Sequence, residues 1–147
     1  MITSRKRFEK EADFLKQIEK IAAAKPFGIV LREKDLPVKE YSALARKVRD
    51  ICRSAGTSLI VHSHPEAARE LGISALHMPL DALEKVNSEE RKDFRVLGAS
   101  CHSVEDVLRA KTLGCDYVTA GHVYATDCKP GLPPRGADFL AEVCGPA

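Results

Sequence analysis

Residues 58–64 read Ser-Leu-Ile-Val-His-Ser-His, a short apolar run that ends in polar side chains. Four further short apolar runs occur along the chain, at residues 27–31, 73–76, 94–99 and 116–120. Such runs, separated by longer amphipathic stretches, are typical of buried strands that alternate with helices around a parallel sheet. In folds of this kind, functional residues gather where strands end and helices begin. We therefore expect a functional rim at the ends of these runs.

The residues that follow the runs agree with this expectation. All five histidines of the chain come directly after apolar runs: His62, His64, His77, His102 and His122. The run at 27–31 is followed instead by a charged cluster, Arg32-Glu33-Lys34. Polar chemistry is thus concentrated at the predicted strand ends.

The stretches between the runs predict helices, because apolar residues recur in them every three or four positions. Ser63, with Glu66 three residues on, and Ser103, with Asp106 three residues on, are candidate helix caps. The predicted helical stretches lie at about 8–24, 37–56, 65–71, 79–94 (one or two short helices), 103–114 and 136–143.

This order of elements predicts an α/β fold. Five strands are clear, and Ile2-Thr3-Ser4 is the candidate tail of a sixth. Because successive parallel crossovers are right-handed, two architectures fit: a (β/α) barrel or an open doubly wound sheet. No linker or low-complexity tract interrupts the chain, so we expect a single domain over residues 1–147.

The composition argues against several classes of protein. A net charge of +2 is too small to indicate a nucleic acid or a membrane surface as partner. No apolar stretch approaches the roughly 20 residues of a membrane span, and the N-terminus lacks the apolar core of a secretion signal. The five cysteines are scattered and form no C-x-x-C pair, as is typical of a reducing compartment. The predicted location is the cytoplasm.

The most distinctive part of the chain is residues 121–132, Gly-His-Val-Tyr-Ala-Thr-Asp-Cys-Lys-Pro-Gly-Leu. This segment resembles the loop after strand 6 in the thiamine phosphate synthase and TenI superfamily. Four further motifs resemble the same superfamily in order and spacing: Leu-Arg-Glu-Lys at 31–34, Ala-Leu-His at 75–77, Leu-Gly-Ala-Ser-Cys-His-Ser at 97–103 and Gly-Cys-Asp-Tyr-Val at 114–118. The resemblance covers essentially the whole chain.

The resemblance implies a TIM-barrel (β/α)8-type fold and one of two activities in thiamine biosynthesis. Synthases join a pyrimidine pyrophosphate to a thiazole phosphate with Mg²⁺, whereas TenI-type tautomerases isomerise a thiazole carboxylate phosphate by proton transfer. Both imply a phosphorylated thiazole small molecule as partner. Because only about six βα units are present, we expect an incomplete barrel that lacks the family's last phosphate-binding loops.

Residue chemistry favours the tautomerase. Synthase-like members carry Asn-Asp where this chain has His62-Ser63, and neither residue is a natural ligand for Mg²⁺. The second synthase aspartate matches Ala82, with Asp81 beside it. His122 stands where synthases usually have proline, and an imidazole that titrates near neutral pH suits a proton shuttle. We therefore favour a TenI-like thiazole tautomerase with His122 as catalytic residue and no cofactor; the alternative is a synthase that uses Mg²⁺.

The substrate-binding residues that we predict are polar side chains at the strand ends. Arg32 and Lys34 leave an apolar strand together, and a guanidinium binds a phosphate through two parallel hydrogen bonds. His77 and His102 are expected to hold loops through backbone hydrogen bonds. We expect no metal site. The other predicted substrate contacts are His62, Ser63, Ser100, Thr126 and Lys129.

Some alternatives remain open at this point. An incomplete barrel would expose apolar strand edges, so the chain could be a weakly stable fragment, a homo-oligomer that completes the barrel, or an open sheet. A non-catalytic phosphate-ligand binder or an inactive truncated remnant is a further functional alternative. A nucleotide-binding domain is disfavoured, because no strand is followed by G-x-G-x-x-G or a P-loop motif.

Overall fold

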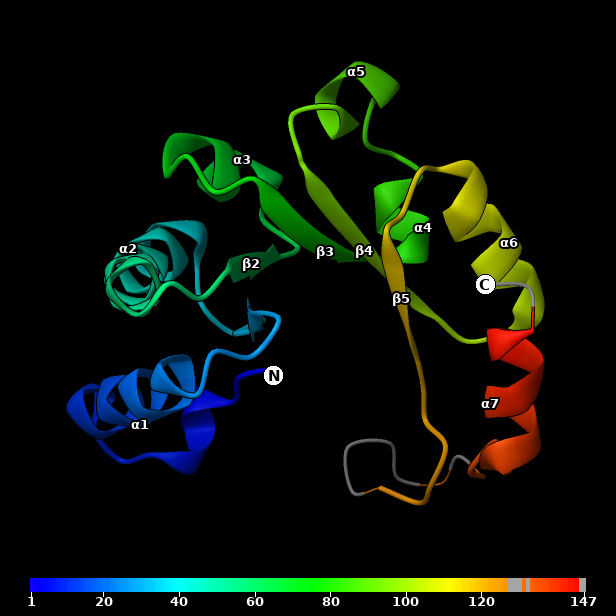
Figure 1. Ribbon diagram of the computed structural model, residues 1–147, viewed down its shortest axis with the longest axis horizontal. Coiled ribbons are helices and arrows are strands. Elements are labelled where there is room, and N and C mark those ends of the chain that lie inside the picture. Colours follow the sequence, from blue (N-terminus) through cyan, green and yellow to red (C-terminus); the bar gives the residue numbers. More distant parts are fainter. Residues whose placement is uncertain (127–130, 132, 146–147) are drawn as a thin grey trace. The chain divides into compact units, whose positions relative to one another are not determined.

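The computed structural model describes residues 1–126, 131 and 133–145 (Figure 1). Strands and helices alternate along these residues, and all five predicted strands are confirmed. The elements are η1 (Arg5–Arg7), α1 (Glu11–Ala23), β1 (Ile29–Leu31), α2 (Val38–Ala55), β2 (Leu59–His62), α3 (Pro65–Glu70), β3 (Ala75–Pro79), α4 (Leu80–Leu83), α5 (Ser88–Arg91), β4 (Val96–Cys101), α6 (Val104–Thr112), β5 (Tyr117–Ala120) and α7 (Gly136–Cys144).

The chain divides into two compact units. Unit 1 comprises Met1–His77 with Lys92–Arg95, and unit 2 comprises Met78–Arg91 with Val96–Ala147. Each unit has its own strand pairing and its own packing of helices, and each is described separately below. The single domain that we expected over residues 1–147 stays a prediction.

Parallel strands form the centre of unit 1. Val30 pairs with Ile60, and Val61 pairs with Leu76, so β1, β2 and β3 follow one another in chain order. Residues of β1 and β2 are buried throughout, as expected for strands covered on both faces. Ile2 makes a single parallel bridge with Val30, so the candidate sixth strand is present as one isolated pair.

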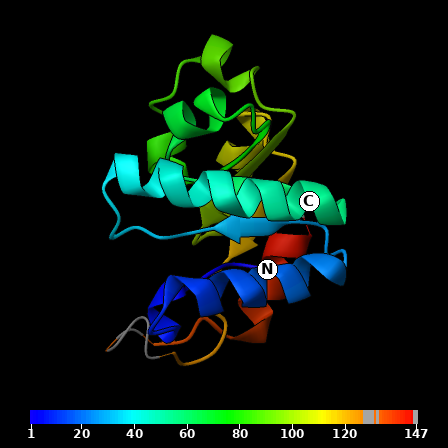
Figure 2. The ribbon, with the colours of Figure 1, turned by 90° about the vertical axis from the view of Figure 1, so that its left-hand side faces the viewer.

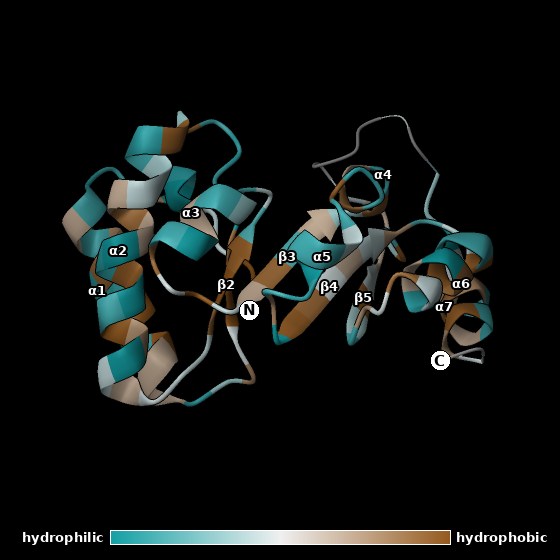
Figure 3. Cartoon of the chain, turned by 90° about the horizontal axis from the view of Figure 1, so that it is seen from above, coloured by the Kyte–Doolittle hydropathy of each residue, from teal (hydrophilic) through white to brown (hydrophobic). Residues whose placement is uncertain are grey.

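Helices α1 and α2 pack against each other in unit 1 and run side by side in Figure 2. Each buries the apolar stripe that its periodicity predicts, with Phe14 and Ile18 in α1 and Leu44 and Val48 in α2. Hydrophilic residues lie on their outer turns, whereas β2 and β3 are largely apolar (Figure 3). The predicted start of the first helix at Phe8 is wrong, because a separate 3-10 turn, η1, precedes α1.

Unit 2 is organised around the parallel pair β4–β5. Ser100 lies opposite Thr119 in this pair, and Gly98 lies opposite Tyr117. Helix α6 begins after Ser103, whose hydroxyl accepts a hydrogen bond from the backbone N–H of Asp106, as the capping pattern predicts. Helix α7 packs against α6.

The second predicted cap is wrong. Helix α3 has His64 as its N-cap, and no side chain caps it. Ser63 adopts a left-handed backbone conformation with φ 62°, so it turns the chain between β2 and α3. Its hydroxyl is therefore placed beside the end of the strand rather than over the helix.

Two expectations from composition can be compared with the described residues. Cys52, Cys101, Cys115 and Cys144 are all free, as expected for scattered cysteines; Cys128 lies outside the described residues. None of the described helices has both the length and the apolarity needed to cross a membrane.

Candidate functional site

Two cations stand at the carboxyl end of β1 in unit 1. Arg32 and Lys34 are exposed, whereas Glu33 between them is only 3% exposed. Arg32 and Lys34 form no ion pair with any residue that the structure describes, while the nearby Asp35 pairs with Arg5 at 2.6 Å. The two cations are therefore available to bind an anion.

The end of β2 carries a buried imidazole next to a hydroxyl. His62 is 4% exposed, and its Nδ1 lies 2.7 Å from the hydroxyl oxygen of Ser63. The His62 ring stacks on that of His77, with centroids 5.5 Å apart. Tyr41 joins the ends of the two strands, because its hydroxyl donates to the carbonyl of Leu31 at 2.7 Å and accepts from the N–H of His62 at 3.0 Å.

The electrostatics of His62 place the two cations near it. Burial is the main cause that lowers the pKa of His62 to about 3, and His77, Lys34, Arg32 and His64 lower it further. The imidazole is thus neutral at physiological pH and offers a hydrogen bond without adding charge. The structure therefore brings together four of the predicted site residues: Arg32, Lys34, His62 and Ser63.

In unit 2, the predicted residues lie around the carboxyl end of the β4–β5 pair. Ser100 is half-buried, and its hydroxyl oxygen accepts a hydrogen bond from Thr119 Oγ1 at 3.3 Å. His122, two residues after β5, is half-buried, and its carbonyl accepts from the N–H of Arg135 at 3.1 Å. Thr126 is exposed, and Lys129 lies outside the described residues.

The two histidines that we expected to be structural make backbone contacts. His102 Nδ1 lies 2.9 Å from the carbonyl oxygen of Gly121, which links the end of β4 to the residue after β5. The carbonyl of His77 accepts from the N–H of Ser63 at 3.0 Å. The His102 ring thus contacts a loop backbone as the sequence predicts, whereas the His77 contact joins two backbone atoms, so the role of the His77 ring stays a prediction.

The donor groups at the end of β2 do not suit Mg²⁺, the metal that the synthase alternative implies. Mg²⁺ prefers carboxylate oxygens, but these positions hold a neutral imidazole and a hydroxyl beside two cations. The carboxylate of Asp81 is exposed and lies 3.6 Å from a guanidinium nitrogen of Arg109. Among the described residues, no three His, Cys, Asp or Glu side chains are grouped as a metal site would require.

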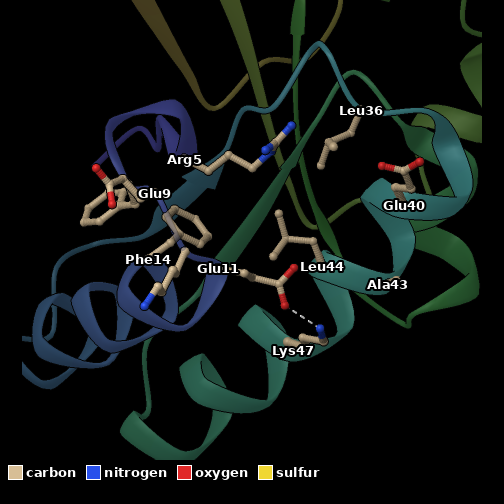
Figure 4. Close-up of a pocket in the computed structure, with 11 residues that line it drawn as sticks. Arg5, Glu9, Glu11, Phe14, Leu36, Glu40, Ala43, Leu44 and Lys47 are labelled. Atoms are coloured by element: carbon tan, nitrogen blue, oxygen red, sulfur yellow. Dashed lines mark hydrogen bonds and ion pairs between the residues drawn. The ribbon is translucent and has the colours of Figure 1, made fainter.

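A pocket of about 290 Å³ in unit 1 was not predicted (Figure 4). It lies between the start of α1, the first half of α2 and the loop that precedes α2, and its apolar lining includes Phe14, Leu36 and Leu44. Glu11 and Lys47 form an ion pair among its lining residues. None of the predicted site residues lines it, and periodicity alone offered no signal for it.

These features define an α/β protein with a cationic strand-end rim. The fold matches a solved structure, the thiamine phosphate pyrophosphorylase of Pyrococcus furiosus, with a TM-score of 0.75 and 24% sequence identity, over 97% of this chain and 66% of that one. The predicted fold class is therefore confirmed: an incomplete TIM-barrel-type fold. The chain belongs to the thiamine monophosphate synthase family, which it matches over residues 1–146.

Two curated relatives of the chain are both named thiamine-phosphate synthase. A thiamine-phosphate synthase of Roseiflexus sp. (strain RS-1) is 33% identical over 121 residues, which cover 78% of this chain and 50% of that protein. A thiamine-phosphate synthase of Bacillus velezensis is 32% identical over 136 residues, or 90% of this chain and 61% of the relative. The chain thus spans between a half and two thirds of the length of these relatives.

Proposed function

We propose that the chain acts in thiamine biosynthesis as a thiamine phosphate synthase, joining a pyrimidine pyrophosphate to a thiazole phosphate. The observation that carries this proposal is the cation pair Arg32 and Lys34 beside neutral His62. Joining the two halves releases pyrophosphate, whose charge must be stabilised as it leaves. Two neighbouring cations whose side chains form no ion pair with the described residues suit that task.

Each residue of the cluster has a role in this proposal. Arg32 and Lys34 bind the pyrophosphate, with the guanidinium providing paired hydrogen bonds and the ammonium a compact charge. His62 and Ser63 orient the bound anion through neutral hydrogen bonds. Because the groups at these positions do not suit Mg²⁺, we assign the stabilisation of charge to the cations. The remaining predicted contacts to the phosphorylated thiazole are Ser100, Thr126 and Lys129.

The comparisons favour the synthase over the tautomerase that we expected from the sequence. Both relatives are named thiamine-phosphate synthase, and the matching structure is a thiamine phosphate pyrophosphorylase. The tautomerase prediction gave weight to single positions such as His122, whereas the similarity to synthases extends over 78–90% of the chain. The role of His122 as proton shuttle stays a prediction, as does a homo-oligomer that completes the barrel.

Turnover by the purified chain tests the proposal. Incubation with the pyrimidine pyrophosphate and the thiazole phosphate, with and without Mg²⁺, should yield thiamine phosphate and free pyrophosphate in equal amounts. Arg32→Gln should lower kcat/KM by about a hundredfold, because it removes a charge that acts on the leaving group. Lys20→Gln, on the exposed side of α1, is the matched control and should leave turnover unchanged.

The competing activity is measured in the same preparation. If the chain instead isomerises the thiazole carboxylate phosphate, and His122→Asn abolishes that activity, the tautomerase is correct and the synthase proposal fails. If Arg32→Gln turns over like the unmodified chain, the cation pair does not carry the reaction.

A further inference from the structure

Glu33 is a buried charged side chain at the end of β1, and it lies between two exposed cations, Arg32 and Lys34. Its carboxylate accepts from two donors: the Thr3 hydroxyl at 2.6 Å, and the backbone N–H of Arg5, which lies 3.0 Å and 3.1 Å from its two oxygens. All the partners lie in the N-terminal segment 3–5. The side chain therefore points toward this segment and is fully used in holding it.

Thr3 completes the connection. Its hydroxyl donates to Glu33, and the same oxygen accepts a hydrogen bond from the backbone N–H of Arg32 at 3.0 Å. The Thr3 backbone N–H donates to the carbonyl of Val30 at 2.9 Å, next to the parallel bridge that Ile2 makes with β1. One buried threonine thus binds the backbone of Arg32 and the side chain of Glu33 at once.

The consequence for the cations follows from the backbone on which they stand. Thr3 binds the backbone N–H of Arg32, and Lys34 lies in a turn that begins at Glu33, whose carbonyl accepts from the N–H of Leu36 at 3.2 Å. The contacts of Thr3 and Glu33 therefore fix the backbone from which both cations project. The positive charges of Arg32 and Lys34 both lower the pKa of His62, so both cations lie near the His62 ring. We propose that Thr3 and Glu33 are positioning residues that hold Arg32 and Lys34 at a fixed separation, as a two-centre site for pyrophosphate.

This inference rests on the proposed anion-binding role of Arg32 and Lys34 and adds a geometric requirement to it. Two cations held at a fixed separation bind the two phosphoryl groups of pyrophosphate together, whereas a single phosphate gains little from the second cation. Loss of the constraint adds an entropic cost to binding that falls mainly on the two-centre ligand. The ratio of pyrophosphate to phosphate affinity therefore reports on positioning.

The test uses calorimetry to compare the binding of inorganic pyrophosphate and inorganic phosphate to the 147-residue chain at one fixed ionic strength. Thr3→Val keeps the shape of the side chain but removes the hydroxyl, and should lower the pyrophosphate affinity by about tenfold with little change for phosphate. Thr3→Ser retains the hydroxyl and should restore the ratio. Glu33→Gln should behave like Thr3→Val, because an amide nitrogen cannot accept from all the donors.

Asp35→Asn is the matched control, since Asp35 pairs with Arg5 and Lys6 and accepts from neither Thr3 nor Arg32 among the described contacts. Urea unfolding of each variant verifies that it is folded under the binding conditions. If folded Thr3→Val has the same ratio of pyrophosphate to phosphate affinity as the unmodified chain, the positioning role is overturned but the anion site is not. Failure of the unmodified chain to bind pyrophosphate overturns the anion site and, with it, this inference.

Discussion

At the scale of single residues, His62 shows how burial and neighbouring charge act on one imidazole. Burial raises the cost of the protonated form, and Arg32 and Lys34 raise it further, so the neutral ring is retained far below the ordinary histidine pKa. His77, stacked on it, has its pKa lowered to about 4, mainly by burial. The result is a pair of uncharged rings beside two cations.

A stability change with pH follows from these values. The folded-state pKa of His62, about 3, lies below the value of about 6.5 for an unfolded histidine, so protons bind preferentially to the unfolded chain. The free energy of unfolding should therefore fall as the pH drops from about 6.5 toward 3, and His62→Gln should reduce this fall. We expect a difference of about 1 kcal/mol between pH 7 and pH 5, after allowance for solvent screening.

Urea denaturation at the two pH values measures this difference. His102→Gln is the control for the loss of an exposed imidazole. An equal pH dependence in His62→Gln and the unmodified chain would contradict a neutral, buried His62.

Gly98 is a residue whose size is dictated by its neighbour. A Cβ atom built at this position would lie 2.3 Å from the ring of Tyr117, across the β4–β5 pair. Gly98→Ala should therefore lower the free energy of unfolding by about 1–3 kcal/mol. In a Tyr117→Ala background the same substitution should cost far less, and a double-mutant cycle measured by urea unfolding separates the two effects. Independent costs would show that the ring does not pack over the glycine.

At the scale of elements, local signals predicted much of the fold, and contacts between distant residues account for what was missed. The strands and the helices α2, α6 and α7 were predicted from apolar periodicity and from residues near each element that begin or end it. The Glu33 interactions were not predicted, because its partners Thr3 and Arg5 lie about thirty positions away and leave no local pattern. Ser63 failed as a cap for a related reason: the same Ser-x-x-acid spacing fits a turn in which the hydroxyl contacts His62.

The comparison of the two serines gives a test at this scale. Ser103→Ala removes the side-chain acceptor at the start of α6 and should lower the free energy of unfolding by about 1 kcal/mol. Ser103→Asp supplies another good capping oxygen and should retain most of the stability. The measurement is thermal or urea unfolding followed by circular dichroism. If Ser103→Ala and Ser103→Asp are equally destabilised, the hydroxyl is not acting as a cap.

At the scale of the whole molecule, the predicted rim divides between the two units. The residues that the structure brings together, Arg32, Lys34, His62 and Ser63, all belong to unit 1, while Ser100 and His122 belong to unit 2. The sequence predicted that both groups follow strands; Arg32, Ser63 and His122 do, whereas His62 is the last residue of β2 and Ser100 lies one residue before the end of β4. Spacing along the sequence does not give the distance in space between the two groups. That both groups bind the same substrate is therefore part of the proposed function.

Strands β2 and β5 differ in how deeply they are buried, and this difference predicts unequal local stability. All four residues of β2 are buried, whereas all four of β5 are only half-buried. Amide groups of deeply buried strands exchange only in large unfolding events, while half-buried strands open locally at lower cost. Hydrogen exchange followed by mass spectrometry should therefore find the amides of β2 roughly tenfold or more slower than those of β5. Equal protection of the two strands would mean that β5 is stabilised by contacts beyond those described here, such as a second copy of the chain.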